Sequence, residues 1–176
     1  MKTEDIEKRL IEHINSQKGV TTPLGKLLFT SSDRIGQGGN GLVYRATIND
    51  KEIAIKFLVS DLESKQLRFK SEYFNTNYAR NELKNIVNMI HYGELEIQDN
   101  VVIPYIIMTC YSKNLKKYRK EKSEINEEIF LSLVNFLFST LNLIHQKGII
   151  HRDIKPENIL VDEHEKFVVS DFGSAH

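Results

Sequence analysis

The sequence predicts an α+β protein in two lobes, the first built mainly of strands and the second mainly of helix. Two observations carry this prediction. Several short segments that suit strands, separated by turn residues, lie between residues 27 and 108, and a long apolar segment with helical character follows Tyr111. The change falls near Cys110. A cleft between two lobes is a common place for a ligand.

The first 27 residues are expected to form a flanking helix and a connector. Residues 3–17 place apolar side chains at helical spacing, and Gly19 follows where a helix would stop. The apolar positions are Ile6, Leu10, Ile11 and Ile14. We expect this helix to cover an edge of the fold. Residues 21–26 contain Pro23 and Gly25, which indicates a connector.

The elements that follow can be placed from their residue patterns. Strands are expected at 27–35, 42–48, 52–59, 95–97 and 101–108, and a small hairpin is expected from 159–161 and 167–170. Helices are expected at 61–79, 115–122 and 126–146. Asn49-Asp50 indicates a tight hairpin turn between two of the strands.

Composition excludes several classes of protein. The 176 residues carry 24 basic and 24 acidic side chains, and this balance argues against a chain built to bind nucleic acid or an anionic membrane surface. A single cysteine, Cys110, can form no intrachain disulfide, and residues 1–10 lack the apolar core of a secretory signal. We therefore expect a cytoplasmic protein. Residues 129–145 carry no charge but are short and interrupted by polar side chains, which favours a buried helix over a membrane span.

A glycine-rich turn joins two of the expected strands in the pattern Gly36-x-Gly38-x-x-Gly41-x-Val43. Glycines let a backbone close over phosphates and offer N–H groups to them. Dinucleotide-binding folds use similar spacing, but there the turn leads into a helix, whereas here it joins two antiparallel strands.

A lysine between apolar residues, Ala54-Ile55-Lys56, lies on the next strand. Its ammonium group is costly to bury without an anionic partner, although a solvated lysine at a sheet edge is the alternative. Glu72 on the following helix is our preferred partner, with Glu63 and Glu82 as rivals.

The strongest signal is the run His151-Arg-Asp-Ile-Lys-Pro-Glu-Asn158, followed by Asp171-Phe-Gly173. It brings two carboxylates, a cation and an amide into two loops. Carboxylate and amide oxygens suit Mg²⁺, which binds through few protein ligands together with substrate phosphates.

These motifs together resemble those of eukaryotic-type serine/threonine protein kinases, in the same order and at similar distances, from about Leu28 to the last residue. The resemblance implies a protein kinase-like two-lobed fold with a complete antiparallel-sheet N-lobe and a partial helical C-lobe. The implied boundaries are 1–27 for the flanking helix and connector, 28–111 for the nucleotide-binding N-lobe, and 112–176 for a partial C-lobe with the catalytic loop.

The resemblance also implies a role for each motif residue in transferring the γ-phosphoryl group of ATP to a serine or threonine of a protein substrate. Asp153 would orient or accept the hydroxyl proton, Lys155 would offset charge on the γ-phosphoryl group, and Lys56, oriented by Glu72, would neutralise the α- and β-phosphates. Asn158 and Asp171 would hold Mg²⁺. The implied ATP-binding residues are Ile35, Gly36, Gln37, Gly38, Gly39, Asn40, Gly41, Val43, Ala54, Lys56, Met108, Thr109, Tyr111 and Leu160.

Two departures from the family pattern leave an alternative open. Asn40 stands at the loop tip, where many kinases have an aromatic residue, and the chain stops three residues after Gly173. We expect a chain truncated after the Asp-Phe-Gly motif. The alternatives are an ATP-binding pseudokinase or interaction module without turnover and, less favoured by the catalytic-loop sequence, a small-molecule kinase. Residues 126–146 are apolar nearly all round, so we expect this helix to need neighbours and to drive self-association or partner binding.

Overall fold

The computed structural model describes residues 3–38, 41–122 and 126–175. The chain forms two compact units. The first contains Met1–Lys70 and Met89–Cys110, and the second contains Ser71–Asn88 and Tyr111–His176. The predicted change from strands to helix near Cys110 therefore falls at a boundary between units, and the second unit also takes a segment from the middle of the chain.

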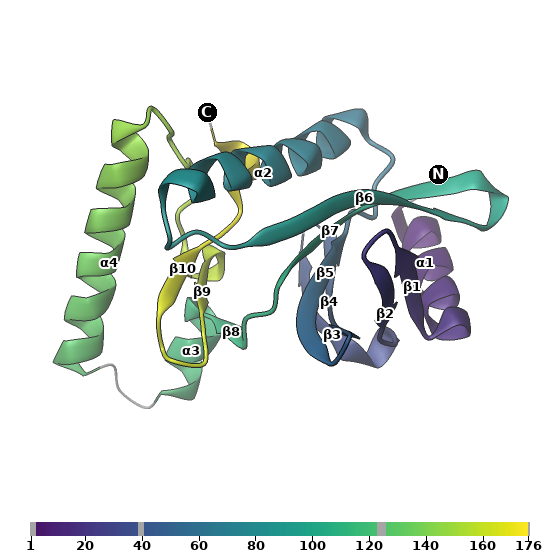
Figure 1. Cartoon of the computed structure of the whole chain (residues 1–176), viewed down its shortest axis with the longest axis horizontal. Helices are drawn as coiled ribbons and strands as arrows, with labels where there is room; N and C mark the ends of the chain where they lie inside the picture. The colour runs from purple at the N-terminus through teal and green to yellow at the C-terminus, as the bar shows by residue number, and fades with distance from the viewer. Residues whose placement is uncertain (1–2, 39–40, 123–125, 176) are drawn as a thin grey trace. The chain divides into compact units, whose positions relative to one another are not determined.

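The first unit is built on a seven-stranded antiparallel sheet (Figure 1). The strands run in the order β1-β2-β4-β5-β7-β6, and β3 pairs with β4 outside this path. Their bounds are β1 (Gly19–Thr22), β2 (Gly25–Leu28), β3 (Arg34–Gly38), β4 (Gly41–Ile48), β5 (Lys51–Phe57), β6 (Met89–Ile97) and β7 (Val101–Thr109). The predicted turn at Asn49-Asp50 is confirmed, since both residues have positive φ, as a type I′ hairpin requires.

Strand register divides the side chains of this sheet between two faces. Tyr44 lies opposite Ile55, and Ile55 lies opposite Ile107, so the three share one face, where all are fully buried. Because successive side chains alternate, Val43 and Lys56, which also lie opposite each other, point to the other face. One face therefore forms the core of the unit and the other carries the predicted nucleotide-binding residues of β4 and β5.

Helix α1 (Thr3–Gln17) completes this core, and its predicted bounds are confirmed. Its buried residues Ile6, Leu10 and Ile14 belong to the same apolar cluster as the core face of the sheet. In Figure 1 the helix lies beside β1 and β2. Its position agrees with the expectation that it covers part of the fold.

Three expectations for the first unit are wrong in detail. Residues 21–26 form the end of a β-hairpin rather than a connector, because β1 pairs with β2 up to Thr22 and Gly25, and Thr22 Oγ1 donates to Gly25 O at 2.9 Å across the turn. The strand expected at 27–35 is broken by a 3₁₀ turn, Ser31–Asp33, which the side chain of Asp33 caps. The strand expected at 95–97 begins at Met89, because polar residues there obscure the alternation.

Helix α2 (Glu63–Glu82) follows β5, near the predicted 61–79. Its residues up to Lys70 belong to the first unit and the remainder to the second. Phe69 is buried in the first unit, and Ala79 is buried in the second, in a cluster with Ile86 and Val169.

The second unit contains a small antiparallel sheet and two helices after residue 110. The sheet has the order β10-β9-β8. The bounds are β8 (Lys113–Asn114), α3 (Leu115–Glu121), α4 (Glu127–Gln146), β9 (Ile159–Val161) and β10 (Phe167–Val169), and the predicted hairpin of β9 and β10 is confirmed. Residues 85–87 join β10 through two backbone hydrogen bonds of 2.9 Å, from Val87 N to Val169 O and from Val169 N to Asn85 O.

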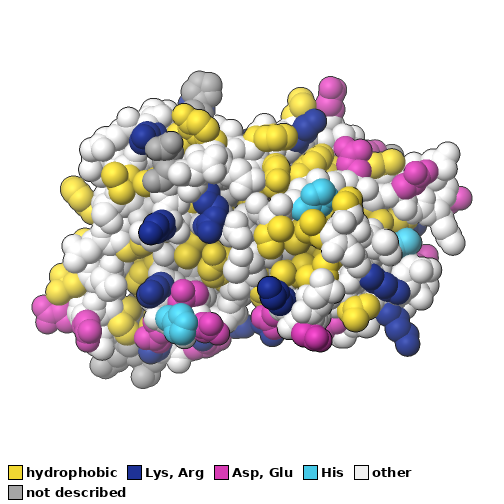
Figure 2. Space-filling model, in the orientation of Figure 1, with side chains coloured by type: hydrophobic (Ala, Val, Ile, Leu, Met, Phe, Trp, Pro, Cys, Tyr) yellow, Lys and Arg dark blue, Asp and Glu magenta, His cyan; other side chains and the backbone are white. Residues whose placement is uncertain are grey.

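Helix α4 is the most apolar element of the second unit, yet much of its surface is exposed. Phe136 contacts Phe167 of β10, with ring centroids 5.6 Å apart, and only Thr140 and Ile144 are buried within the helix. Figure 2 shows apolar side chains along the edge formed by α4. The exposed ones are Phe130, Leu131, Val134, Phe138 and Leu143. By length and composition alone α4 could cross a membrane, but core helices of soluble proteins pass the same test.

Candidate active site

Three predicted catalytic residues of the second unit are joined in one hydrogen-bond network. Lys155 Nζ donates to Asp153 Oδ2 at 2.7 Å, and Asn158 Nδ2 donates to the same oxygen at 3.0 Å and to the Asp153 backbone carbonyl at 2.9 Å. The hydrogen bond from Lys155 is the largest influence that lowers the pKa of Asp153, and the same bond raises the pKa of Lys155. Asp153 is therefore an ionised carboxylate at neutral pH.

His151 holds this loop against the Asp-Phe-Gly segment. Its side chain is 1% exposed, Nε2 lies 2.9 Å from Ser170 O, and Nδ1 accepts from Asp153 N at 3.3 Å. Burial is the main cause that lowers the pKa of His151. A neutral ring with the proton on Nε2 satisfies both contacts, because Nε2 then donates to the carbonyl and Nδ1 accepts.

The two loops are also joined through Asn158 and Ser170. Ser170 N and Oγ both donate to Asn158 O, at 2.9 and 3.0 Å. The next residue, Asp171, has left-handed backbone angles of φ 65° and ψ 65°, and Arg152 has φ 65°. Such angles are uncommon for residues other than glycine, and they persist where surrounding contacts hold them. The loops that carry Asp153, Asn158 and Asp171 are thus fixed against each other.

The side chains of Asn158 and Asp171 fit a magnesium site of the kind that substrate phosphates complete. Since Asn158 Nδ2 is engaged by Asp153, its oxygen Oδ1 is the atom suited to a cation, and Asp171 supplies a carboxylate. Mg²⁺ commonly uses one or two carboxylates together with phosphates and water. Within residues 3–38, 41–122 and 126–175, no three histidine, cysteine or acidic side chains lie close enough together to hold a metal ion.

In the first unit, Lys56 lies on the sheet face opposite the core. Its side chain is 8% exposed, and its Nζ lies 5.6 Å from the centre of the Phe69 ring. The sequence left two possibilities for Lys56, a buried lysine with an anionic partner and a solvated lysine at a sheet edge. The second is wrong, because Lys56 is buried and β5 is an interior strand between β4 and β7.

The glycine-rich turn is the hairpin between β3 and β4. Gly36 pairs with Val43 and Gly38 with Gly41. Gly41 has φ +117°, and a Cβ there would lie 2.0 Å from Phe57 O, so only glycine fits. Gln37 and the exposed Ile35 lie on β3. The predicted binding residues Gly39 and Asn40 fall outside the residues that the structure describes.

Other predicted binding residues are divided between the units. Ala54 pairs with Met108 across β5 and β7, so their side chains share the face that carries Lys56. Thr109 ends β7 in the first unit, while Tyr111 and Leu160 belong to the second. Leu160 and Val168 lie opposite each other in the small sheet, on the face away from the buried residues Ile159 and Val161.

Burial separates Glu72 from one of its two rivals on α2, Glu63. Glu72 is 3% exposed in the second unit, and the helix-starting Glu63 is exposed. The side chain of Glu82 is not among those the structure describes. A buried carboxylate is expected to have a partner, since an unpaired buried charge is strongly unfavourable.

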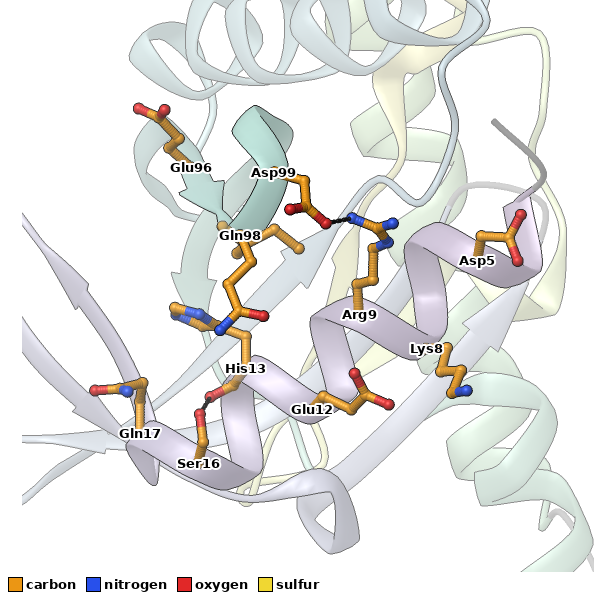
Figure 3. Close-up of a pocket in the computed structure, with 11 residues that line it drawn as sticks. Asp5, Lys8, Arg9, Glu12, His13, Ser16, Gln17, Glu96, Gln98 and Asp99 are labelled. Carbon is orange, nitrogen blue, oxygen red and sulfur yellow. Dashed lines mark hydrogen bonds and ion pairs between the residues drawn. The ribbon is translucent and has the colours of Figure 1, made fainter.

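A separate hollow in the first unit lies between α1 and the turn from β6 to β7 (Figure 3). It has a volume of about 810 Å³ and polar walls, and Arg9 pairs with Asp99 across it at 2.5 Å. Among the described residues, none of the predicted site residues lines it.

Sequence reasoning assigned no role to His151 or Ser170. His151 opens the recognised run, but its function depends on the carbonyl of Ser170, nineteen residues away. The sequence did contain a signal that His151 is buried. It follows the apolar pair Ile149-Ile150 directly, a place where a solvated histidine is not expected.

Comparison with known proteins places the chain in a family. Residues 29–176 match the protein kinase domain model. The chain is 34% identical over 146 residues to a protein of Clostridium acetobutylicum named a probable serine/threonine-protein kinase, covering 81% of this chain and 22% of that protein. It is 33% identical over 149 residues to a protein of the same description from Lactococcus lactis, covering 80% and 22%.

A mouse dual specificity protein kinase is 28% identical over 181 residues, covering 91% of this chain and 20% of that protein. The chain belongs to the protein kinase family. Among its relatives it is similar to serine/threonine kinases, and it spans about a fifth of the length of the curated relatives it matches.

Proposed function

We propose that this chain binds MgATP and carries the phosphoryl-transfer residues of a serine/threonine protein kinase that acts on a protein substrate. The observation that carries the proposal is the hydrogen-bonded set of Asp153, Lys155 and Asn158, tied to the loop of Asp171. Phosphoryl transfer depends on positioning and charge neutralisation more than on covalent chemistry, and this set supplies both.

Asp153 is suited to orient the substrate hydroxyl. Its Oδ2 accepts from Lys155 and Asn158, so Oδ1 is the oxygen available to a hydroxyl group. With a lowered pKa the carboxylate is a weak base, which favours holding the hydroxyl in line and receiving its proton late in the transfer. Lys155, 2.7 Å from that carboxylate, would meet the γ-phosphoryl group as negative charge moves toward the bridging oxygen.

The remaining residues divide the binding of MgATP between them. Backbone N–H groups of the β3–β4 hairpin would bind phosphates, and Lys56, with Glu72 as its orienting partner, would neutralise them. Ile35, Val43, Ala54 and Leu160 would offer apolar surface to the adenine ring, with Met108 behind the segment of Thr109 and Tyr111. Mg²⁺, when bound, would neutralise phosphate charge, held by Asp171 and Asn158. The lone Cys110 supports a cytoplasmic location for this activity.

Nucleotide titration and phosphotransfer test the proposal together. A fluorescent ATP analogue should bind in a Mg²⁺-dependent manner, and Lys56→Met with Asp171→Asn should abolish that binding. Asp153→Asn should lower turnover about 10²–10⁴-fold with little change in nucleotide affinity, because the carboxylate contacts the hydroxyl rather than the nucleotide.

Glu157→Gln is a matched control for Asp153→Asn, since Glu157 lies in the same loop but pairs outward with Lys116 at 2.6 Å. Equal rates for the wild type and Asp153→Asn would remove Asp153 from the mechanism. Binding of MgATP without any turnover would instead favour the alternative of an ATP-binding module.

We further propose that the exposed face of α4 is covered by a second copy of the chain. Its exposed residues include Phe130, Val134 and Phe138, the last of them 80% exposed. Apolar patches of this kind usually mark an interface or an aggregation liability. The isolated chain is accordingly expected to self-associate and to show weak phosphotransfer, which sedimentation velocity and kinase assays on the purified chain would measure.

A further inference from the structure

Helix α1 lies outside the segment that matches the kinase domain model, which begins at residue 29. It is nevertheless an integral part of the first unit, because Leu10 and Ile14 share a core cluster with Phe29 and Tyr44. The segment from residue 30 to residue 34, which follows Phe29 directly, leads into β3 and so into the glycine-rich hairpin.

Two side chains of α1 contact this entry segment at both of its ends. Asn15 Oδ1 accepts from the backbone N–H of Ser31 at 2.9 Å. Glu7 Oε1 lies 3.4 Å from Arg34 Nη1, an ion pair at the first residue of β3. Glu7 and Asn15 are about two helical turns apart, so the helix spans the entry segment rather than contacting it at one point.

The entry segment is itself fixed, so a restraint at Ser31 is transmitted to Arg34. The Asp33 carboxylate accepts from Thr30 N at 2.7 Å and from Thr30 Oγ1 at 3.0 Å, and Asp33 N donates to Thr30 O at 3.1 Å. These reciprocal bonds form a capping box around the 3₁₀ turn.

Strand β3 needs such an anchor because, in the part of the chain that the structure describes, it has a single partner in the sheet. That partner is β4, and the register between the two strands shifts between Arg34 and Gly36. The residues that follow, Ile35 to Gly38, carry predicted nucleotide contacts, yet no second strand holds them in place. The position of β3 is therefore set by β4 on one side and by the contacts of its first residue.

We propose that α1 positions the glycine-rich hairpin, with Glu7 and Asn15 as the positioning residues that fix where β3 leaves the core. The expected effect on MgATP affinity rests on the function proposed above. The expected effect on hydrogen exchange in the hairpin does not depend on that function. Among the described residues, Glu7 and Asn15 have no hydrogen bond or ion pair with the predicted nucleotide site, so they act through Ser31 and Arg34.

Two readouts test this proposal in the full 176-residue chain. In Glu7→Gln combined with Asn15→Ala, amide hydrogen exchange should become about threefold to tenfold faster at residues 34–38 and 41–43, the range expected for one exposed ion pair and one hydrogen bond. The dissociation constant of MgATP should rise by a similar factor while turnover at saturating MgATP stays the same.

Matched controls lie on the same helix. Glu12→Gln removes the same charge at a position that, among the described residues, has no hydrogen bond or ion pair with residues 30–34. Arg9→Gln breaks the pair with Asp99 across the hollow of Figure 3. Both should leave exchange in the hairpin within about twofold of the wild type, since neither ties α1 to β3. Arg34→Gln removes the ion pair from the β3 side and should also make exchange in the hairpin faster. The charge reversal Glu7→Arg combined with Arg34→Glu should restore the ion pair and the slow exchange.

Wild-type exchange rates in Glu7→Gln combined with Asn15→Ala would overturn the proposal. Faster exchange spread evenly over the whole first unit would also overturn it, because that pattern indicates a loss of stability rather than a loss of positioning. If the wild-type chain binds no MgATP, the proposed function fails, and the exchange comparison still decides whether α1 positions the hairpin.

Discussion

The two units place their apolar residues differently. In the first, α1 has a narrow apolar stripe, charged residues elsewhere, and Leu10 at its centre is 0% exposed against the sheet. In the second, α4 is apolar nearly all round and buries only Thr140 and Ile144, while polar groups of the catalytic loops, His151 and Asn158, are buried instead. The width of a helix's apolar surface indicates how many neighbours it needs. Within the described residues, the apolar stripe of α1 is covered, whereas α4 packs one side against β9 and β10 and leaves other apolar side chains exposed.

The largest expected effect tests the closed core of the first unit. Leu10→Ala should lower the free energy of unfolding by about 2–5 kcal/mol, because it removes a fully buried side chain and leaves a cavity between α1 and the sheet. Urea denaturation would measure the change, and Lys8→Ala, on the exposed side of the same helix, is the control. A loss below about 1 kcal/mol would show that α1 is only loosely attached to the core.

The next effect tests the open face of the second unit. Phe138→Ser should weaken self-association about tenfold or more, since covering a phenylalanine is worth about 1.5–3 kcal/mol, and the free energy of unfolding of the monomer should change little. Asn142→Ser, at an exposed polar position on the same helix, should change neither quantity. Sedimentation velocity over a range of concentrations decides the matter, and a wild-type chain that stays monomeric contradicts the proposed interface.

Much of the fold and the candidate site could be predicted because the informative residues lie close together in the sequence. The hairpin of β3 and β4 and the run from His151 to Asn158 each place their chemistry within a few residues. The helices α1 and α4 follow from apolar periodicity alone.

What could not be predicted depends on contacts between residues far apart in the chain. The break between β2 and β3 is made locally, by the Asp33 side chain bonding to Thr30, but the anchoring of that turn to α1 comes from Asn15, sixteen residues before Ser31. The partner of the buried His151 is equally invisible in the sequence, since the carbonyl that its ring meets lies on Ser170, nineteen residues away. No hydrophobic pattern encodes such polar contacts, which become apparent only once the chain is folded.

The smallest expected effect concerns the pH dependence that the buried His151 gives to the second unit. Burial lowers the pKa of His151 in the folded chain, although the Ser170 carbonyl, Asp171 and Asp153 oppose this. In the unfolded chain the ring titrates near its ordinary value of 6.5. Above that pH the ring is neutral in both states and its contribution to stability is fully present.

As the pH falls below 6.5, the unfolded chain takes up a proton before the folded chain does, so stability falls until the lower folded pKa is passed. One proton gives a slope of at most about 1.4 kcal/mol per pH unit. Thermal melts between pH 7.5 and 5 should show this slope in the wild type and a shallower one in His151→Gln. His164→Gln, which alters an exposed histidine on the β9–β10 turn, should keep the wild-type slope. Parallel curves for wild type and His151→Gln would mean that the ring takes up its proton at the same pH in the folded and unfolded chains, so that burial does not lower the pKa of His151.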